Sequence, residues 1–405
     1  MRKNSPSNVV SGRSRSQVLL YGPPFGTSIP GGAGGGTGGY TRNMEAYLHS
    51  LQLPSVEMHP LFHTVRHQKS GLLGSFPVRF LIDSWRITVK FTRRRPDAVH
   101  VLAFYKQALP REFFLAAACW LGKIPLIYDV KAGDFIDCYN RRGPFYRIMV
   151  RSILRQASVV LVEGGPYKPF LKQRFSIEAH YFPNFVPEAE VPTQVPRRLQ
   201  DDELKILFVG YCHEEKGVRD LVEGCARLAR ANRSVALTLI GKEEVGFKAY
   251  ADAFELPVRM RLQRLGRRPH QDVRAAMLEN DIFCFPSRRE GHSNAINEAM
   301  MSGMVITCTR RGFLERVVGA ENGYFMDTGT ADEVERSLIA IAEAPDEARA
   351  RARRARAKLI AEFTSKVAVE RLAVAYNQAF KENAEEFSRS ARYHEPVANS
   401  PSSAD

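Results

Sequence analysis

Continuous apolar runs alternate with amphipathic helical patterns along almost the whole chain. The runs typical of strands are 18–21, 98–103, 125–130, 158–163, 205–211, 235–241, 259–265, 281–286, 304–308 and 323–326. Helical periodicity fills the gaps, for example at 41–51, 216–230, 271–278, 295–301 and 331–344. The apolar runs show no polar alternation, as expected for strands that are covered on both faces. Repeated strand–helix units of this kind predict parallel sheets with right-handed crossovers.

The chain divides where this alternation stops. Pro187, Pro192 and Pro196 lie in an aperiodic stretch that is typical of an interdomain linker. We therefore predict an α/β fold of two Rossmann-like, doubly wound domains that face each other across a cleft, with ligands at the carboxyl ends of the strands. The predicted parts are a disordered N-terminus 1–16, a first domain 17–185, the linker 186–200, a second domain 201–363, a helix 364–384 and a disordered tail 385–405.

The composition agrees with two globular domains. A chain of 405 residues with 44% hydrophobic residues exceeds one ordinary core. The six cysteines form no C-x-x-C motif and lie singly in apolar runs, so we expect reduced, buried thiols and a cytoplasmic protein. We also expect no secretory signal and no membrane span, because no apolar run has the necessary length and position.

The formal net charge of +14 favours acidic partners, such as nucleotide phosphates, nucleic acid or an anionic membrane surface. The segments 76–95 and 145–155 combine aromatic or aliphatic residues with arginines and lysines. Such segments are typical of helices on an anionic membrane, but core packing with a solvated basic edge explains them equally well. The arginines at 349–358 predict a solvated helix. No nucleic-acid-binding motif accompanies the charge, so we expect no nucleic-acid partner.

The segment 287–303 carries the most informative chemistry. Glu290 and Glu298 lie on either side of a short polar loop that begins with Gly291, between a predicted strand and a predicted helix. The N-terminus of a helix attracts phosphate and other anions, because its N–H groups are unpaired and carry partial positive charge. A carboxylate beside such an anion site has the hydroxyls of a sugar or ribose as its natural ligand. The segment therefore suggests a nucleotide-linked sugar.

Two further motifs contain glycines next to predicted strands. Gly210 ends one strand, and Lys216 and Gly217 follow at the predicted start of a helix, where a lysine can stabilise the charge on a departing diphosphate. A glycine-rich loop at 31–39 contains a formal G-x-G-x-x-G pattern. Prolines separate this loop from the strand at 18–21, which disfavours a dinucleotide fingerprint. This leaves two interpretations of the loop: it contacts a ligand, or it is merely flexible.

Taken together, Gly210, Lys216-Gly217, the Glu290-x7-Glu298 pair and the helix that ends at Gly303 resemble the C-terminal domain of retaining glycosyltransferases of family 4, the glycosyl transferases group 1. The resemblance implies the GT-B fold, with the helix 364–384 crossing back to the first domain. It implies transfer of a sugar, with retention of configuration, from a nucleotide-diphosphate donor to a saccharide or lipid-linked saccharide in polysaccharide or glycoconjugate biosynthesis. It also implies that no metal or other cofactor is needed.

The same resemblance implies roles for individual residues. Glu290 would contact the transferred sugar and Lys216 the diphosphate, as the catalytic pair, while Glu298 would hold the ribose. The remaining donor-binding candidates are Gly210, Gly217, Gly266, Arg267, Arg288, Gly291, His292, Ser293 and Asn294. The candidates on the acceptor side or in the glycine loop are Gly38, Gly39, Asp129 and Asp134.

Two departures from the family pattern limit these roles. Tyr211 stands where family members usually carry an arginine, which leaves Lys216 as the clear diphosphate cation and Arg288 or Arg289 as substitutes. Asp129 or Asp134 stands in for a histidine that is common in the first domain.

A nucleotide-sugar epimerase of the same fold and a nicotinamide-dependent oxidoreductase are the alternative functions. The expected location is cytoplasmic, or peripheral on the inner face of a membrane.

Overall fold

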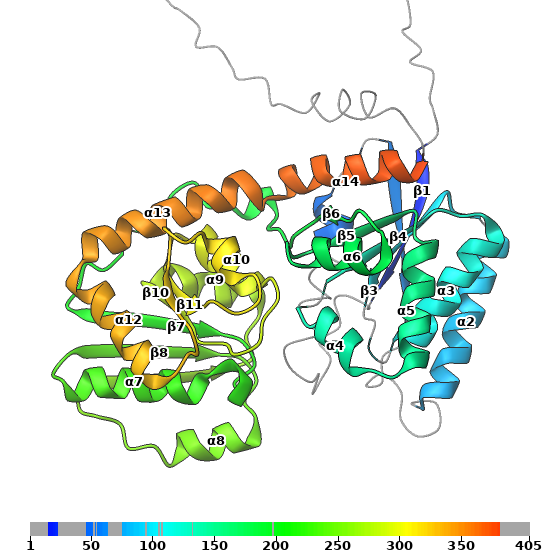
Figure 1. Ribbon diagram of the computed structural model, residues 1–405. Helices are drawn as coiled ribbons and strands as arrows, with labels where there is room; N and C mark the ends of the chain where they lie inside the picture. Colours follow the sequence, from blue (N-terminus) through cyan, green and yellow to red (C-terminus); the bar gives the residue numbers. More distant parts are fainter. Residues whose placement is uncertain are drawn as a thin grey trace, which may run out of the picture.

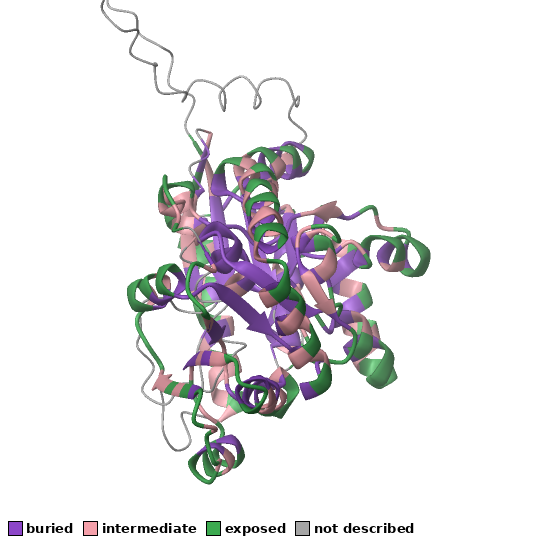
Figure 2. Ribbon diagram, turned by 90° about the vertical axis from the view of Figure 1, so that its left-hand side faces the viewer, coloured by how far each residue is buried: buried purple, intermediate pink, exposed green. Residues whose placement is uncertain are grey.

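The computed structural model describes residues 15–22, 46–51, 53, 55–63, 75–93, 95–103, 106, 108–131, 133–196 and 198–380. Two six-stranded parallel sheets, each flanked by helices, lie side by side (Figure 1). Buried residues are concentrated in the strands of both sheets (Figure 2). The predicted class of two Rossmann-like α/β domains is confirmed by this arrangement.

The first sheet has the strand order β2-β1-β3-β4-β5-β6. Its strands are β1 Ser16–Gly22, β2 Val56–Phe62, β3 Ala98–Ala103, β4 Leu126–Val130, β5 Val159–Val162 and β6 His180–Tyr181. The helices of this half are α2 Phe76–Arg93, α3 Leu109–Gly122, α4 Phe135–Arg141, α5 Pro144–Gln156 and α6 Tyr167–Phe175. The strands β3, β4 and β5 are buried along their whole length, which explains their mainly apolar sequences.

The second sheet has the order β12-β11-β10-β7-β8-β9. Its strands are β7 Glu203–Val209, β8 Ser234–Ile240, β9 Met260–Gly266, β10 Ile282–Phe285, β11 Val305–Thr309 and β12 Tyr324–Met326. Its helices are α7 Val218–Arg230, α8 Val245–Asp252, α9 His270–Glu279, α10 Asn294–Met301, α11 Leu314–Val318, α12 Ala331–Glu343 and α13 Pro345–Glu362. The sequence order reverses between β7 and β10, a switch point at which open α/β sheets bind ligands.

The last described helix, α14 Ser365–Phe380, returns to the first sheet (Figure 1). Its Leu372 and Tyr376 belong to the same buried cluster as Val18, Leu20 and Ile127 of that sheet. Where α13 meets α14, a parallel bridge joins Thr364 to Val186, so the chain's two crossings between the halves lie together. The C-terminal helix therefore supplies part of the N-terminal core.

Three sequence-based expectations need correction. The strand β2 was not predicted, because His59 and Pro60 interrupt its apolar pattern; it forms because an edge strand tolerates proline. The short strand β6 was missed for lack of any pattern. The arginines of α13 are not simply solvated, since Arg356 donates to the carbonyl oxygen of Met301 at 3.1 Å and other arginines of this helix also bond to backbone carbonyls.

Among the described residues, no helix combines the length and the apolar character that crossing a membrane requires.

Candidate active site

The loops that follow β7 and β10 meet at the carboxyl ends of these neighbouring strands. Gly217 has a φ of +65°, which favours glycine, and it is the N-cap residue of α7 after a 3-10 turn at Glu214–Lys216. The predicted helix 216–230 therefore starts two residues later than expected. A Cβ at position 217 would lie 2.3 Å from the carbonyl oxygen of Pro286. Glycine is thus required for the loop carrying Lys216 to reach the loop carrying Glu290.

The two predicted catalytic residues are in direct contact. The Nζ of Lys216 forms a salt bridge with Oε2 of Glu290, and both side chains are largely buried, with 16% and 15% of their surface exposed. The hydroxyl of Ser287 donates to the same carboxylate oxygen at 3.3 Å. The Lys216 ammonium also lies 5.3 Å from the ring centre of Phe285. The structure therefore brings together one cation and one carboxylate that are 74 residues apart in sequence.

The helix α10 begins directly after this pair. Ser293 is its N-cap residue, but the Ser293 side chain makes no capping hydrogen bond, and Asn294 is the first helical residue. Glu298 is buried within α10, and its Oε2 lies 3.8 Å from Nε2 of His270 at the start of α9. A helix N-terminus without a side-chain cap is suited to an anionic ligand. The predicted anion site and the two acids thus lie on one strand–loop–helix unit.

Two other glycines of the donor set lie at the ends of β7 and β9. Gly210 follows β7 and donates its N–H to the carbonyl oxygen of Ile240 at 2.9 Å. Gly266 ends β9 with a φ of +64°, and the exposed Arg267 follows it. These residues are at the carboxyl edge of the second sheet, as the Lys216 and Glu290 loops are.

The two arginines after β10 point to different partners. Arg288 donates to Oδ2 of Asp220 in α7 at 2.6 Å. Arg289 forms a salt bridge with Asp134 of the first half, which also pairs with Lys106 at 2.8 Å. Each arginine is thus paired with a carboxylate in this structure, as Lys216 is with Glu290. Asp134 instead links the first half to the candidate donor loop.

The other first-domain candidate, Asp129, is completely buried. Its carboxylate accepts a hydrogen bond from the Tyr47 hydroxyl and lies 3.7 Å from the Lys131 ammonium and 3.6 Å from the His100 ring. In this conformation Asp129 therefore belongs to a buried network and presents no exposed surface to an acceptor. The glycine-loop candidates Gly38 and Gly39 lie outside the described residues.

Gly291 and His292 lie against the first half. The His292 ring is buried, donates from Nε2 to Oδ1 of Asn297 at 2.9 Å, and packs edge-on against Phe363 with centroids 5.2 Å apart. Burial lowers the pKa of His292 to about 4, so the ring is neutral. Its carbonyl oxygen accepts a hydrogen bond from Nδ2 of Asn184 at 2.7 Å. The ring and the carbonyl oxygen of His292 are therefore both engaged within the protein.

Sequence reasoning missed Glu163 and Lys131. Glu163 directly follows β5 and is buried, and burial raises its pKa to about 8. Lys131 directly follows β4 and donates from Nζ to the carbonyl oxygen of Phe182 at 2.5 Å. A charged residue at the end of each of two mainly apolar runs was the available signal, because charged side chains are seldom buried without a partner.

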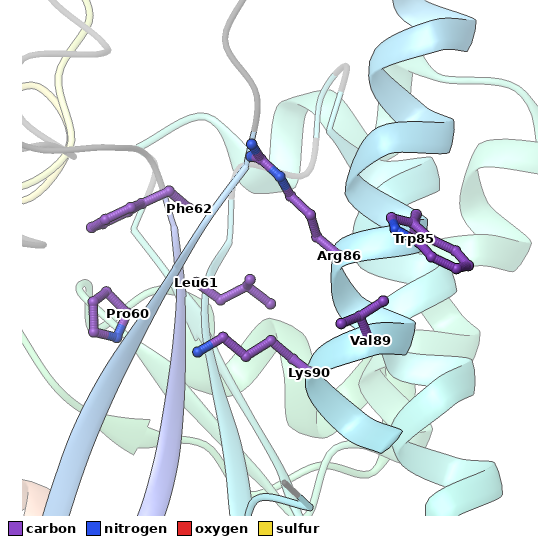
Figure 3. Close-up of a pocket in the computed structure, with 7 residues that line it drawn as sticks. All are labelled: Pro60, Leu61, Phe62, Trp85, Arg86, Val89 and Lys90. Atoms are coloured by element: carbon purple, nitrogen blue, oxygen red, sulfur yellow. The ribbon is translucent and has the colours of Figure 1, made fainter. Parts of the chain in front are cut away.

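A separate groove lies on the outer edge of the first sheet, between β2 and α2 (Figure 3). It has a volume of about 420 Å³. Its lining residues are Pro60, Leu61, Phe62, Trp85, Arg86, Val89 and Lys90. The groove is apolar along the strand and carries two cations on the helix.

Comparisons with known proteins match part of this chain. Residues 193–358 match the family model described as Glycosyl transferases group 1. An MMP alpha-(1->4)-mannosyltransferase of Mycolicibacterium hassiacum is 31% identical over 136 residues, which are 33% of each chain. A glycogen synthase of Mycobacterium tuberculosis is 25% identical over 168 residues, or 41% of each chain. The chain thus spans about a third to two fifths of the length of the curated relatives that it matches.

The likeness in structure extends further along the chain. The crystal structure of Anabaena Alr3699/HepE in complex with UDP and glucose has a TM-score of 0.61 and 15% sequence identity, and it covers 90% of this chain and 100% of that one. At this identity the likeness establishes the fold. The chain has the GT-B fold, and its residues 193–358 match the model of the glycosyl transferases group 1 family.

Proposed function

We propose that this protein is a glycosyltransferase that moves a sugar from a nucleotide-diphosphate donor to a saccharide or lipid-linked saccharide acceptor, in polysaccharide or glycoconjugate biosynthesis. The observation that carries the proposal is the contact between Lys216 and Glu290 beside the N-terminus of α10. The group 1 domain at 193–358 contains all of these residues. The relatives named as a mannosyltransferase and a glycogen synthase support the reaction class.

In the proposed mechanism the Lys216–Glu290 salt bridge opens when the donor binds. The diphosphate replaces Glu290 as the partner of Lys216, and the ammonium stabilises the charge that develops on the leaving group. Glu290 then accepts hydrogen bonds from hydroxyls of the transferred sugar. Lys216 thereby supplies leaving-group stabilisation that other transferases take from a metal ion, so we propose a reaction without a metal cofactor.

Glu298 binds the ribose hydroxyls in this proposal. Its burial in α10, close to the anion-binding end of the same helix, supports a short distance between ribose and diphosphate. The backbone around Gly266 and Arg267 meets the base. Attack by the acceptor on the same face as the departing diphosphate gives retention of configuration, as the resemblance to family 4 implies. The complex of HepE with UDP and glucose supports a uridine donor as the first to test.

Nucleotide binding tests the proposal. UDP or GDP at 100 times its dissociation constant stabilises a folded protein by about 2.7 kcal/mol, so we expect a clear rise in the melting temperature. NAD is the matched control for the oxidoreductase alternative. Stabilisation by NAD equal to that by UDP or GDP, or no stabilisation by any of the three, would contradict the proposal.

Turnover tests the assigned chemistry. Release of UDP from UDP-glucose, or of GDP from GDP-mannose, in the presence of membrane extract is expected for the native protein. Glu290→Ala is expected to abolish transfer without changing the melting temperature by more than the exposed control Glu255→Ala does. An active Glu290→Ala variant would refute the role of Glu290.

We also propose that the groove between β2 and α2 rests on an anionic membrane surface, where lipid-linked acceptors reside. On α2, Trp85 and Leu81 are 70% and 65% exposed, and Arg86 and Lys90 lie beside Trp85 (Figure 3). Exposed aromatic and aliphatic side chains enter the interface of a bilayer, while neighbouring cations attract its headgroups. On α5, Phe145 is exposed in the same way. The protein is then cytoplasmic and peripheral on the inner face of the membrane.

Sedimentation with vesicles tests this surface. We expect binding to vesicles containing phosphatidylglycerol and little binding to pure phosphatidylcholine. Reversing both cations in Arg86→Glu/Lys90→Glu is expected to weaken binding at least about tenfold, since each basic residue contributes about 1 kcal/mol. Arg233→Glu/Arg259→Glu, on the second domain, changes the net charge equally and is the control. Equal loss in both double variants would contradict the assignment.

A further inference from the structure

Glu163 lies where the first half of the molecule touches the candidate donor loop. Its Oε1 is so close to Gly291 that a Cβ added at position 291 would lie 2.5 Å from it. The same Cβ would lie 2.8 Å from Cα of Gly133. The backbone at Gly291 therefore passes between a carboxyl group and the backbone of the first domain, in a space that only glycine fits.

Lys131 is the cation beside the Glu163 carboxyl. Its side chain is 1% exposed, and its Nζ is 3.7 Å from Oδ2 of Asp129 and 4.6 Å from the ring centre of Phe182. The charge of Lys131 lowers the pKa of Glu163, while burial raises it by more. A carboxyl group enclosed in this way has its orientation fixed by its partners, because leaving it without them would cost several kcal/mol.

Residues of the first half face the His292 backbone. The His292 backbone acts on the Glu163 carboxyl and lowers its pKa, and the His292 carbonyl accepts from Nδ2 of Asn184 at 2.7 Å. Nδ2 of Asn297, in α10, in turn donates to the carbonyl oxygen of Asn184 at 3.1 Å. The peptide that follows Glu290 and Gly291 is therefore oriented by residues of the other half of the molecule.

We propose that Glu163 is a positioning residue for sugar transfer: when the two halves meet, its carboxyl group holds the Gly291–His292 peptide so that Glu290 and the start of α10 face the transferred sugar. This inference rests on the proposed function, because it assigns the sugar to this loop. The donor site is built on the second domain, but by this inference it also needs Glu163 from the first domain. Donor binding to the second domain alone then leaves the sugar incompletely oriented.

Variants of Glu163 separate positioning from general stability. Glu163→Ala removes the carboxyl group, whereas Glu163→Gln keeps an oxygen that accepts the same hydrogen bond. The control is Glu178→Gln, at an exposed glutamate that pairs with Lys172. The first measurement is hydrogen–deuterium exchange of peptides covering 288–294 in the ligand-free protein. We expect Glu163→Ala to accelerate exchange there about tenfold or more, and Glu163→Gln to restore most of the protection.

The second measurement is kinetic. With UDP-glucose or GDP-mannose as donor, Glu163→Ala is expected to lower kcat by about 100-fold, as misplacement of a catalytic group does. The dissociation constant for UDP or GDP alone is expected to change less than about twofold, since Lys216 binds the diphosphate and Glu298 binds the ribose. Glu163→Gln is expected to recover most of kcat, an outcome that a merely space-filling role would not require.

The two measurements fail separately. Unchanged exchange in Glu163→Ala would overturn the positioning role even if the native protein is an active transferase. Equal losses of UDP binding and of kcat would also overturn it. If the native protein turned over neither donor and bound neither nucleotide, the proposed function would fail, while the exchange comparison would still decide whether Glu163 holds the loop.

Discussion

His292 is a histidine whose charge state is tied to folding. Its ring is enclosed by Asn297 and Phe363, and the positive charges of Lys131 and Arg371 act on it from the first sheet and from α14. Burial is the main cause of its lowered pKa, and these two cations add to it. A protonated ring would be a buried positive charge close to two other cations. Protonation of His292 therefore favours the unfolded chain.

This gives a prediction for stability at acidic pH. The pKa of His292 falls from 6.5 to about 4 on folding, so the unfolded state binds more protons between these values. The contribution of His292 is complete above pH 6.5 and is lost as the pH falls towards 4, with a total of about 3 kcal/mol. We expect His292→Gln, which keeps a donor for Asn297, to lose less stability than the native protein between pH 6.5 and 4.5.

Urea unfolding at the two pH values measures this difference. His180→Gln, at a histidine bonded to Gln378, is the control and should follow the native protein. Identical pH dependence in His292→Gln and the native protein would show that another group causes the acid sensitivity. His100 is one such group, because burial lowers its pKa as well.

Single residues were predictable where a strand end marked them. Glu290 and Lys216 follow apolar runs, and parallel strands bring such positions to one edge of a sheet, so their meeting was expected. Glu163 follows an apolar run too, but its partners Lys131 and His292 belong to other parts of the chain. No local pattern shows which residues will enclose a side chain, so the role of Glu163 required the structure.

At the scale of elements, Arg198 joins two helix ends. It lies in the segment between the sheets, is 3% exposed, and its guanidinium group donates to backbone carbonyls at the ends of α9 and α10. The accepting carbonyls belong to Met277, Leu278, Asn280, Ser302 and Gly303. Carbonyls at helix C-termini lack partners within the helix and carry partial negative charge, so one buried cation satisfies several at once.

Replacing this arginine should destabilise the second domain. Arg198→Met keeps the length of the side chain but leaves the buried carbonyls without their donor, at an expected cost of about 3 kcal/mol in unfolding free energy. Arg336→Met is the control, since Arg336 is exposed and bonds to a carbonyl of its own helix at 3.3 Å; it should change stability by less than about 0.5 kcal/mol. Equal effects in denaturant unfolding would show that Arg198 does not join the helices.

The elements themselves were more predictable than such contacts. Strands buried on both faces have continuous apolar sequences, so β3 and its neighbours were predicted to within a few residues. The edge strand β2 lacks that constraint and escaped detection. Arg198 lies in a proline-containing stretch without periodicity. Its acceptors are backbone carbonyls, which every residue type has, so they leave no pattern in the sequence. Nothing in the sequence therefore distinguished it from a surface arginine.

At the scale of the whole molecule, a few close contacts set how the two halves meet. The ring of Phe313, from the second half, lies directly on Gly164, where a Cβ would come within 1.9 Å of it. The same ring packs edge-on against Tyr167, with centroids 5.1 Å apart. The fold class followed from repeated strand–helix units, whereas this orientation depends on single side chains against glycine. Periodicity carries no information of that kind.

The return of α14 to the first sheet has a consequence for how the protein is made. The buried face formed by Val18, Leu20 and Ile127 is completed by Leu372 and Tyr376, more than 240 residues later in the chain. A ribosome synthesises the N-terminal strands first, so this apolar face must wait until almost the whole chain has emerged. The first half therefore reaches its final packing only after the second has been synthesised, and a chain cut before α14 exposes a face suited to aggregation or to a chaperone.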